Sequence, residues 1–116
     1  MAFVSTTDLD RAHTFYAETL GLEPVDRTPF ACVFLVGATP LRVTRADEVV
    51  AAPYTVLGWV VTDIAEEMAD LAGRGVTFEQ YQGMTDEIGV WTTPGGDKIA
   101  WFKDPDGNVL SLTQFA

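Results

Sequence analysis

Few side chains in this sequence are suited to covalent or acid–base chemistry. The 116 residues include one histidine, His13, and one cysteine, Cys32. Cys32 lies in the apolar run 31–36, which predicts a buried thiol in a strand, and a lone cysteine excludes an internal disulfide. His13 lies one turn after Leu9 in a helical pattern, so we expect a solvated or partly packed helix residue rather than a catalyst.

Tyrosines and loop carboxylates are the remaining candidates for general acid–base work. They are Tyr54, Tyr81, Asp86 and Glu87, and none has a sequence neighbour that would tune its pKa. The stretch from Tyr81 to Glu87 has loop composition, and a mobile lid there is one hypothesis.

The elements that must position these residues follow a plan that occurs twice. Residues 4–9 resemble residues 59–64, and both stretches lead from a short apolar strand through Thr-Asp into a helical pattern. Asp8 and Asp63 are predicted to cap the two helices, because a carboxylate accepts hydrogen bonds from the free N–H groups of a first turn.

Apolar spacing then predicts the elements of each half. It predicts a helix over 9–20 that Gly21 ends, and a second over 64–71 that Gly73 or Gly75 ends. Strand-like segments follow at 22–25, 30–36 and 41–44 in the first half, and at 76–80, 88–93, 98–103 and 109–113 in the second. We therefore expect an α+β fold in a single domain over 1–116, with modules of about 1–47 and 54–116.

The last two predicted strands are joined by a clear turn signal. The run Asp104–Gly107 places proline and glycine where a type I turn and a glycine bulge require them. Such a hairpin pairs Lys103 with Val109 and Trp101 with Ser111.

Charge excludes several classes of partner. Seventeen acidic residues against seven basic ones give a net charge of −10, which repels nucleic acid and anionic membrane surfaces and attracts cationic small molecules. No apolar run approaches the ~18 residues of a membrane span, and the first residues lack the basic region of a signal peptide. We expect a cytoplasmic protein.

Two motifs resemble those of the vicinal oxygen chelate superfamily, which contains glyoxalase I, extradiol dioxygenases, fosfomycin-resistance enzymes and bleomycin-resistance proteins. Asp8–Tyr16 with Leu20–Leu22 is similar to its first-helix signature, and Trp101–Asn108 is similar to its closing hairpin. The resemblance covers nearly the whole chain. It implies two βαβββ modules that form a curved mixed sheet, or cup, with the helices on the outer face and the ligand inside.

The resemblance also tells where a catalytic metal would bind. Enzymes of this family hold Fe, Mn, Ni or Zn with His and Glu side chains, at positions that fall here on Met1, near Arg42, near Val56 and on Ser111. A thioether, a guanidinium, an alkyl group and a hydroxyl do not supply the ligands that these metals prefer. We expect no metal and no other cofactor.

The resemblance, together with strand alternation, predicts which side chains line the cup: Phe3, Ser5, Arg42, Thr44, Val56, Val60, Ile99, Trp101, Ser111 and Thr113. Trp101 corresponds to an active-site aromatic of the fosfomycin-resistance enzymes; it stacks on a flat ligand or merely fills the cup. Arg42 clamps a ligand oxygen or pairs with one of the chain's carboxylates. Trp59 is expected in the core under the second helix, and Trp91 cannot be assigned a face.

Two functions follow from these observations. The first is a metal-free binder of a small molecule, cationic or flat and aromatic, similar to the bleomycin-resistance proteins that sequester a drug unaltered. The alternative is a lyase, isomerase or dioxygenase with a non-standard or metal-independent site. The resemblance further implies a homodimer.

Overall fold

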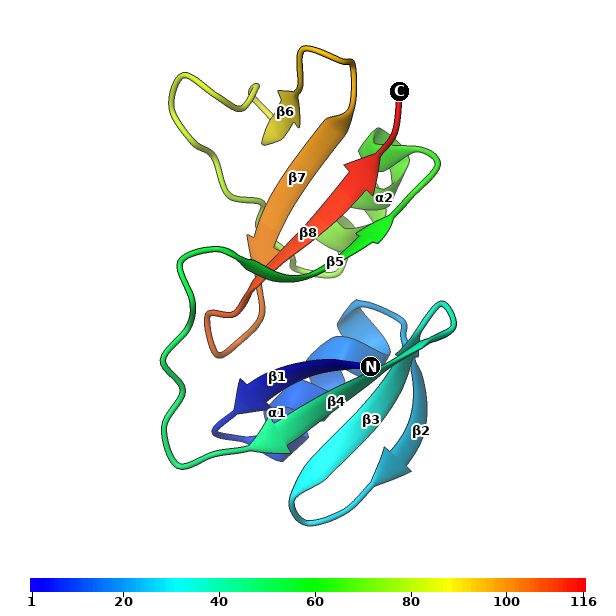
Figure 1. The fold of residues 1–116 in the computed structure, drawn as a ribbon, viewed down its shortest axis with the longest axis vertical. Coiled ribbons are helices and arrows are strands. Elements are labelled where there is room, and N and C mark those ends of the chain that lie inside the picture. Colours follow the sequence, from blue (N-terminus) through cyan, green and yellow to red (C-terminus); the bar gives the residue numbers. More distant parts are fainter. The chain divides into compact units, whose positions relative to one another are not determined.

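The computed structural model describes all residues from Met1 to Ala116 and divides into two compact units. The first unit holds residues 1–52 and 104–108, and the second holds residues 53–103 and 109–116. Each unit contains one four-stranded sheet and one main helix (Figure 1). Neither helix is long and apolar enough to cross a membrane.

The two units share one topology, which confirms the predicted α+β fold of two βαβββ modules. The elements of the first unit are β1 (Ala2–Thr6), α1 (Leu9–Thr14), β2 (Glu23–Arg27), β3 (Ala31–Val36) and β4 (Thr39–Arg45). Those of the second are β5 (Thr55–Val60), α2 (Ile64–Gly73), β6 (Val90–Thr92), β7 (Lys98–Lys103) and β8 (Val109–Gln114). The strand orders are β1-β4-β3-β2 and β5-β8-β7-β6, with the β1–β4 and β5–β8 pairs parallel and the others antiparallel.

Both predicted helix caps are present and nearly identical. The Asp8 carboxylate accepts a hydrogen bond from the backbone N–H of Arg11, and Asp63 accepts one from Glu66, each at 3.1 Å. The two caps share an extended backbone, with φ of −141° and −138°. The sequence repeat therefore marks a real structural repeat.

The first helix differs from its prediction as one regular helix over 9–20. After Thr14 the chain continues as a π-helical segment, Phe15–Thr19, in which the N–H of Leu20 donates to the carbonyl of Phe15 at 2.9 Å. Tyr16 and Leu20 stay buried in this wider turn. Apolar spacing could not reveal the change, because both kinds of turn keep these residues on the inner face.

Two strands of the second unit were predicted too long. Segment 76–80 forms a single bridge, Phe78 to Phe102, because the N–H of Val76 still bonds the carbonyl of Leu71 in the last turn of the helix. Segment 88–93 shortens to β6, because Gly89 turns with a φ of +99°. The closing hairpin has the predicted pairs, Lys103 with Val109 and Trp101 with Ser111.

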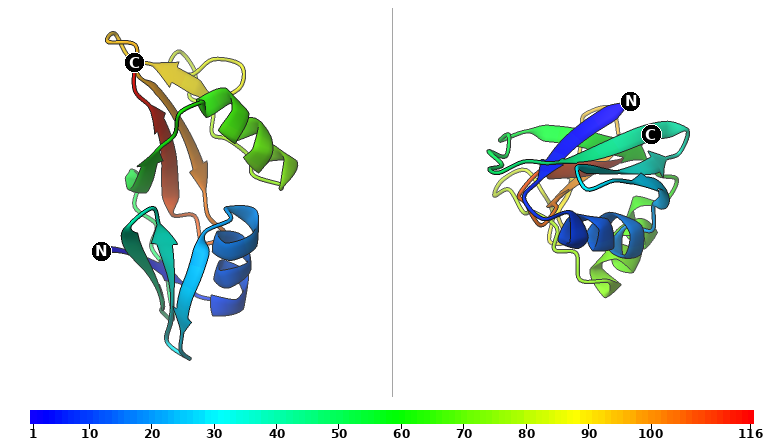
Figure 2. Two further views of the ribbon diagram at one scale, coloured as in Figure 1. Left: turned by 90° about the vertical axis from the view of Figure 1, so that its right-hand side faces the viewer. Right: turned by 90° about the horizontal axis from the view of Figure 1, so that it is seen from below.

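Each helix packs on one face of its sheet, and the apolar alternation places the core there (Figure 2). Leu41 and Val43 are fully buried under α1, and Leu110 and Leu112 under α2. Cys32 is buried in β3, as predicted. The ring of His13 is half-buried 5.4 Å from that of Phe34, which makes it a partly packed helix residue.

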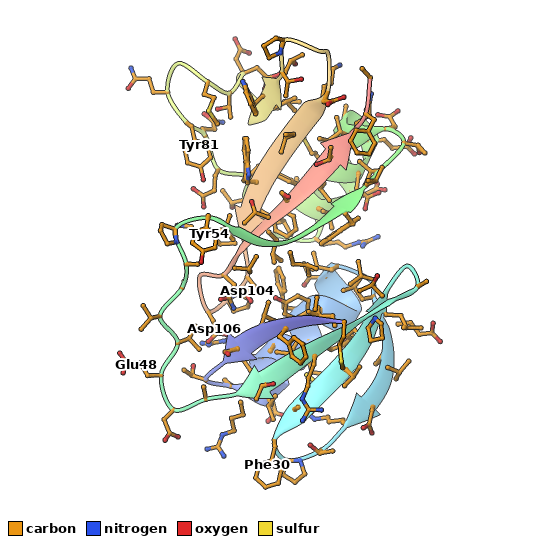
Figure 3. The ribbon with its side chains drawn as sticks, in the orientation of Figure 1. Phe30, Glu48, Tyr54, Tyr81, Asp104 and Asp106 are labelled. Carbon is orange, nitrogen blue, oxygen red and sulfur yellow. The ribbon has the colours of Figure 1, made fainter.

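The hairpin turn 104–108 belongs to the first unit and carries a dense polar network (Figure 3). Tyr16 donates its hydroxyl hydrogen to Asp104 at 2.7 Å. Asp106 accepts hydrogen bonds from the Thr6 hydroxyl (2.5 Å), the Thr7 backbone (3.0 Å) and the Arg11 guanidinium (2.9 Å). The turn predicted from the sequence therefore both closes the hairpin and is held to β1 and α1 by side-chain hydrogen bonds.

Candidate binding site

The residues predicted to line a cup fall into two groups, one in each unit. Phe3, Arg42 and Thr44 lie in the first unit, on the sheet face away from α1. The parallel β1–β4 pairing places Phe3 beside Arg42 and Ser5 beside Thr44. Arg42 makes no hydrogen bond or ion pair within its unit, so the predicted carboxylate partner is not found there.

The second group lies on the face of the second sheet away from α2. Trp101 is paired with Ser111, and Ile99 with Thr113. Val56 stands apart, because the β5–β8 register shifts between Thr55 and Leu57 and leaves Val56 without a partner, 37% exposed.

Ser111 is closely packed against the neighbouring strand. It is buried and faces Gly58 of β5, where a Cβ atom would come within 2.4 Å of the Ser111 Oγ. The hydroxyl therefore occupies the space that the glycine leaves free.

The donor set at the family's metal positions does not fit a metal. Met1, Arg42, Val56 and Ser111 offer a thioether, a guanidinium, an alkyl group and a packed hydroxyl. Within either unit, no three His, Cys, Asp or Glu side chains are grouped so as to hold an ion. Chemistry through a metal is therefore not assigned to these residues.

One pocket of the second unit includes Trp101. Its volume is about 330 Å³, and it is lined by Pro53, Tyr54, Thr55, Tyr81, Gln82, Met84, Trp101 and Val109. No lining residue is charged. We call this the aromatic pocket (Figure 3 labels Tyr54 and Tyr81).

Two aromatic side chains lie against the Trp101 ring. The Tyr81 ring lies 5.5 Å from the Trp101 ring at an interplanar angle of 80°. Trp91 stacks on Trp101 at 6.1 Å and 24°, which assigns the face that the sequence left open. Trp59 instead packs edge-on to the buried Phe102, on the helix side, as predicted.

The loop that carries Tyr81 and Met84 is held by its own hydrogen bonds. The Asp86 carboxylate accepts from the backbone N–H groups of Ile88 (3.0 Å) and Val90 (2.9 Å). The N–H of Tyr81 donates to the Thr85 hydroxyl at 2.9 Å. One wall of the pocket is thus formed before any ligand binds.

Sequence reasoning identified Trp101 but did not join it to Tyr54 and Tyr81. Both tyrosines lie outside the alternating segments, so strand periodicity carried no information about where they point. Of the acid–base candidates predicted from the sequence, the two tyrosines line the pocket. The Asp86 carboxylate instead accepts hydrogen bonds from the loop backbone, and Glu87 is exposed.

A larger cleft, about 580 Å³, lies in the first unit and includes Asp8, Asp10, Arg27 and Arg45. Its size does not make it the better candidate. Asp8 caps α1, and Asp10 pairs with Arg27. The aromatic pocket is smaller, but its side chains are free of such partners.

Comparison with known proteins shows what this architecture resembles. The chain matches the family model described as Glyoxalase/Bleomycin resistance protein/Dioxygenase superfamily over residues 1–112. No curated protein sequence matches it significantly.

Similar solved structures share the fold at low sequence identity. A glyoxalase family protein from Bacillus anthracis is 18% identical, with a TM-score of 0.79 over 99% of this chain and 92% of the other. Lactoylglutathione lyase from Agrobacterium tumefaciens is 20% identical, with a TM-score of 0.75 over 97% and 90%. TioX from Micromonospora sp. ML1 is 18% identical, with a TM-score of 0.76 over 99% and 96%. The repeated βαβββ modules and the match to the family model agree: the chain belongs to the glyoxalase/bleomycin resistance protein/dioxygenase superfamily.

Proposed function

We propose that this protein binds a small organic molecule without a metal, and that the aromatic pocket is where the ligand is held. The observation that carries the proposal is the pocket itself. Three partly exposed aromatic rings, Tyr54, Tyr81 and Trp101, line a space of about 330 Å³ that has no charged side chain. Ligand sites of this kind bind through apolar and stacking contacts.

The donor chemistry supports binding rather than metal-assisted turnover. The four positions that would hold the metal provide no carboxylate, imidazole or thiolate. No carboxylate or histidine lines the aromatic pocket either, which leaves Tyr54 and Tyr81 as its only acid–base candidates. The alternative of a metal-independent lyase, isomerase or dioxygenase would be supported by turnover of a hemithioacetal, epoxide or catechol.

The finer proposals follow from family membership and charge. We propose sequestration of a drug or natural product, with a flat aromatic or cationic ligand, because the net charge of −10 attracts cations. The open-face residues Phe3, Arg42, Thr44, Val56, Ile99, Ser111 and Thr113 are proposed as further ligand contacts. We also propose a cytoplasmic homodimer, which light scattering tests by reporting twice the chain mass.

The test is a titration followed by tryptophan fluorescence. Flat aromatic compounds that are cationic, neutral or anionic are added to the purified chain, and at least one class is expected to quench the emission at saturable concentrations. Trp101→Leu should abolish the effect, whereas Trp59→Phe is the matched control, since the half-buried Trp59 packs against Phe102 and does not line the pocket. Equal quenching in wild type and Trp101→Leu would reject the pocket as the site.

A further inference from the structure

We infer that the ligand of the aromatic pocket carries an alkylated ammonium group, which the rings hold by cation–π attraction. This inference rests on the proposed function and names the chemical class that the pocket selects. It differs from stacking of a flat ring, because the recognised group is a compact cation.

The geometry of the rings supports a cation site. The Tyr81 and Trp101 rings meet edge-on at 80°, a corner rather than a parallel slot, with the edge of one ring toward the other. Trp91 stacks against Trp101 and so supports one wall of this corner. Tyr54 contributes a third ring to the lining, and Met84 a polarizable thioether. A cation is attracted to each ring face that it meets, whereas a flat ligand stacks on only one of two perpendicular planes.

The exposure of these side chains points to a ligand rather than to the core. Tyr54 is 67% exposed and Tyr81 is 40% exposed, and the hydroxyl of neither is hydrogen-bonded. Rings that face solvent over an uncharged pocket are available to a cation from outside.

The charge of the second unit favours a cation over an anion, and the hydrogen-bonding groups of the lining favour an alkylated ammonium over other cations. The second unit carries eight acidic and three basic side chains, a net charge of −5, so its field attracts cations to the pocket. The nearby Lys103 is paired with Glu79 at 3.9 Å. A primary ammonium or guanidinium is held best by a carboxylate, whereas this lining offers only neutral hydroxyl and amide oxygens. A quaternary ammonium has no N–H to satisfy and needs only ring faces.

The experiment compares two probes of one shape, choline and 3,3-dimethyl-1-butanol, which differ in the charge of the trimethyl head. Both are titrated against the full chain, followed by tryptophan fluorescence and by protein-observed NMR. We expect choline to bind about fivefold or more tightly than the neutral alcohol, which is the order of a cation–π advantage at a partly exposed site. Tyr81→Phe should keep the preference, because it keeps the ring, whereas Tyr81→Leu should lose most of it.

Each outcome separates this inference from the proposed function. Equal binding of the two probes, or a choline preference that survives in Tyr81→Leu, overturns the cation site and leaves an apolar binder. If neutral flat aromatics bind and choline does not, the cation site is overturned and the proposed function stands. Failure of every probe and every flat aromatic to perturb Trp101 overturns both. Far-UV circular dichroism and a thermal midpoint close to that of wild type confirm that the variants fold.

Discussion

Asp106 accepts four hydrogen bonds and shows how one carboxylate anchors a turn. Burial by itself would raise its pKa. Hydrogen bonds from Thr6 and Thr7 and the Arg11 guanidinium outweigh that effect and hold the pKa of Asp106 below its ordinary value of 3.8. The folded state therefore favours the ionised form.

This shift predicts how stability depends on pH. A carboxylate whose folded pKa is lowered stabilises the fold above its unfolded pKa, and this contribution is lost as pH falls from about 4 through the folded value. Asp106→Asn should cost about 1–3 kcal/mol of unfolding free energy at pH 7 and much less at pH 2. Urea unfolding at both pH values measures this, with Asp47→Asn as the exposed control. An equal loss at the two pH values would contradict the ionic role.

Gly58 and Ser111 give a second residue-scale test, because they share one space across the β5–β8 pair. Gly58→Ala should destabilise the fold by about 1–3 kcal/mol, since the new Cβ would lie 2.4 Å from the Ser111 Oγ. Ser111→Ala removes that atom and should restore at least about 0.5 kcal/mol in the double variant. Thermal or urea unfolding of the four proteins completes the cycle, and additive effects would mean that the hydroxyl does not fill this space.

At the scale of elements, the turns were easier to predict from the sequence than the path of the long loop. The closing hairpin was predicted with its register, because proline and glycine in Asp104–Gly107 allow few backbone conformations. The two helix caps were predicted for the same kind of local reason. The loop between α2 and β6 was not, because its residues at 76–80 alternate like a strand but pair with β7 at a single bridge only. The pocket escaped prediction because this loop supplies one of its walls.

Asp86 is expected to position that wall. Asp86→Ala removes the acceptor for the N–H groups of Ile88 and Val90, so the loop should loosen and the ligand affinity should fall about tenfold, with little change in the thermal midpoint. Asp86→Asn keeps an oxygen acceptor and should retain most of the affinity. The neighbouring Glu87→Gln is the control, because that side chain is exposed. Unchanged affinity in Asp86→Ala, measured by fluorescence titration, would show that the loop does not need this anchor.

At the scale of the whole molecule, the chain repeats one βαβββ module, and the two copies differ in the residues on the sheet face away from the helix. Phe3 lies beside Arg42 on the face of the first sheet, and Gly58 lies beside Ser111 at the equivalent pairing in the second. The fold could be predicted because the repeat, the caps and the hairpin all indicate it independently. The site could be predicted only in part, because open-face residues have no periodicity of their own to reveal what they bind.

We propose that the two units unfold together as a single domain. The chain passes between them three times, at residues 52–53, 103–104 and 108–109, so neither unit is a continuous segment. The three tryptophans lie in the second unit and the buried Cys32 in the first, which gives each unit its own signal. Fluorescence and thiol reactivity should give the same urea midpoint. Two separate midpoints would show that the units fold independently.

The central claim, binding without a metal in the aromatic pocket, is tested most directly by one titration under two conditions. A flat or quaternary cation that quenches Trp101 is titrated into the protein, first after exhaustive chelation and then after incubation with Fe, Mn, Ni and Zn, with elemental analysis of both samples. We predict the same affinity in both, less than about a tenth of an equivalent of bound metal, and loss of binding in Trp101→Leu. Stoichiometric metal that a chelator removes, together with binding that requires it, would contradict this account.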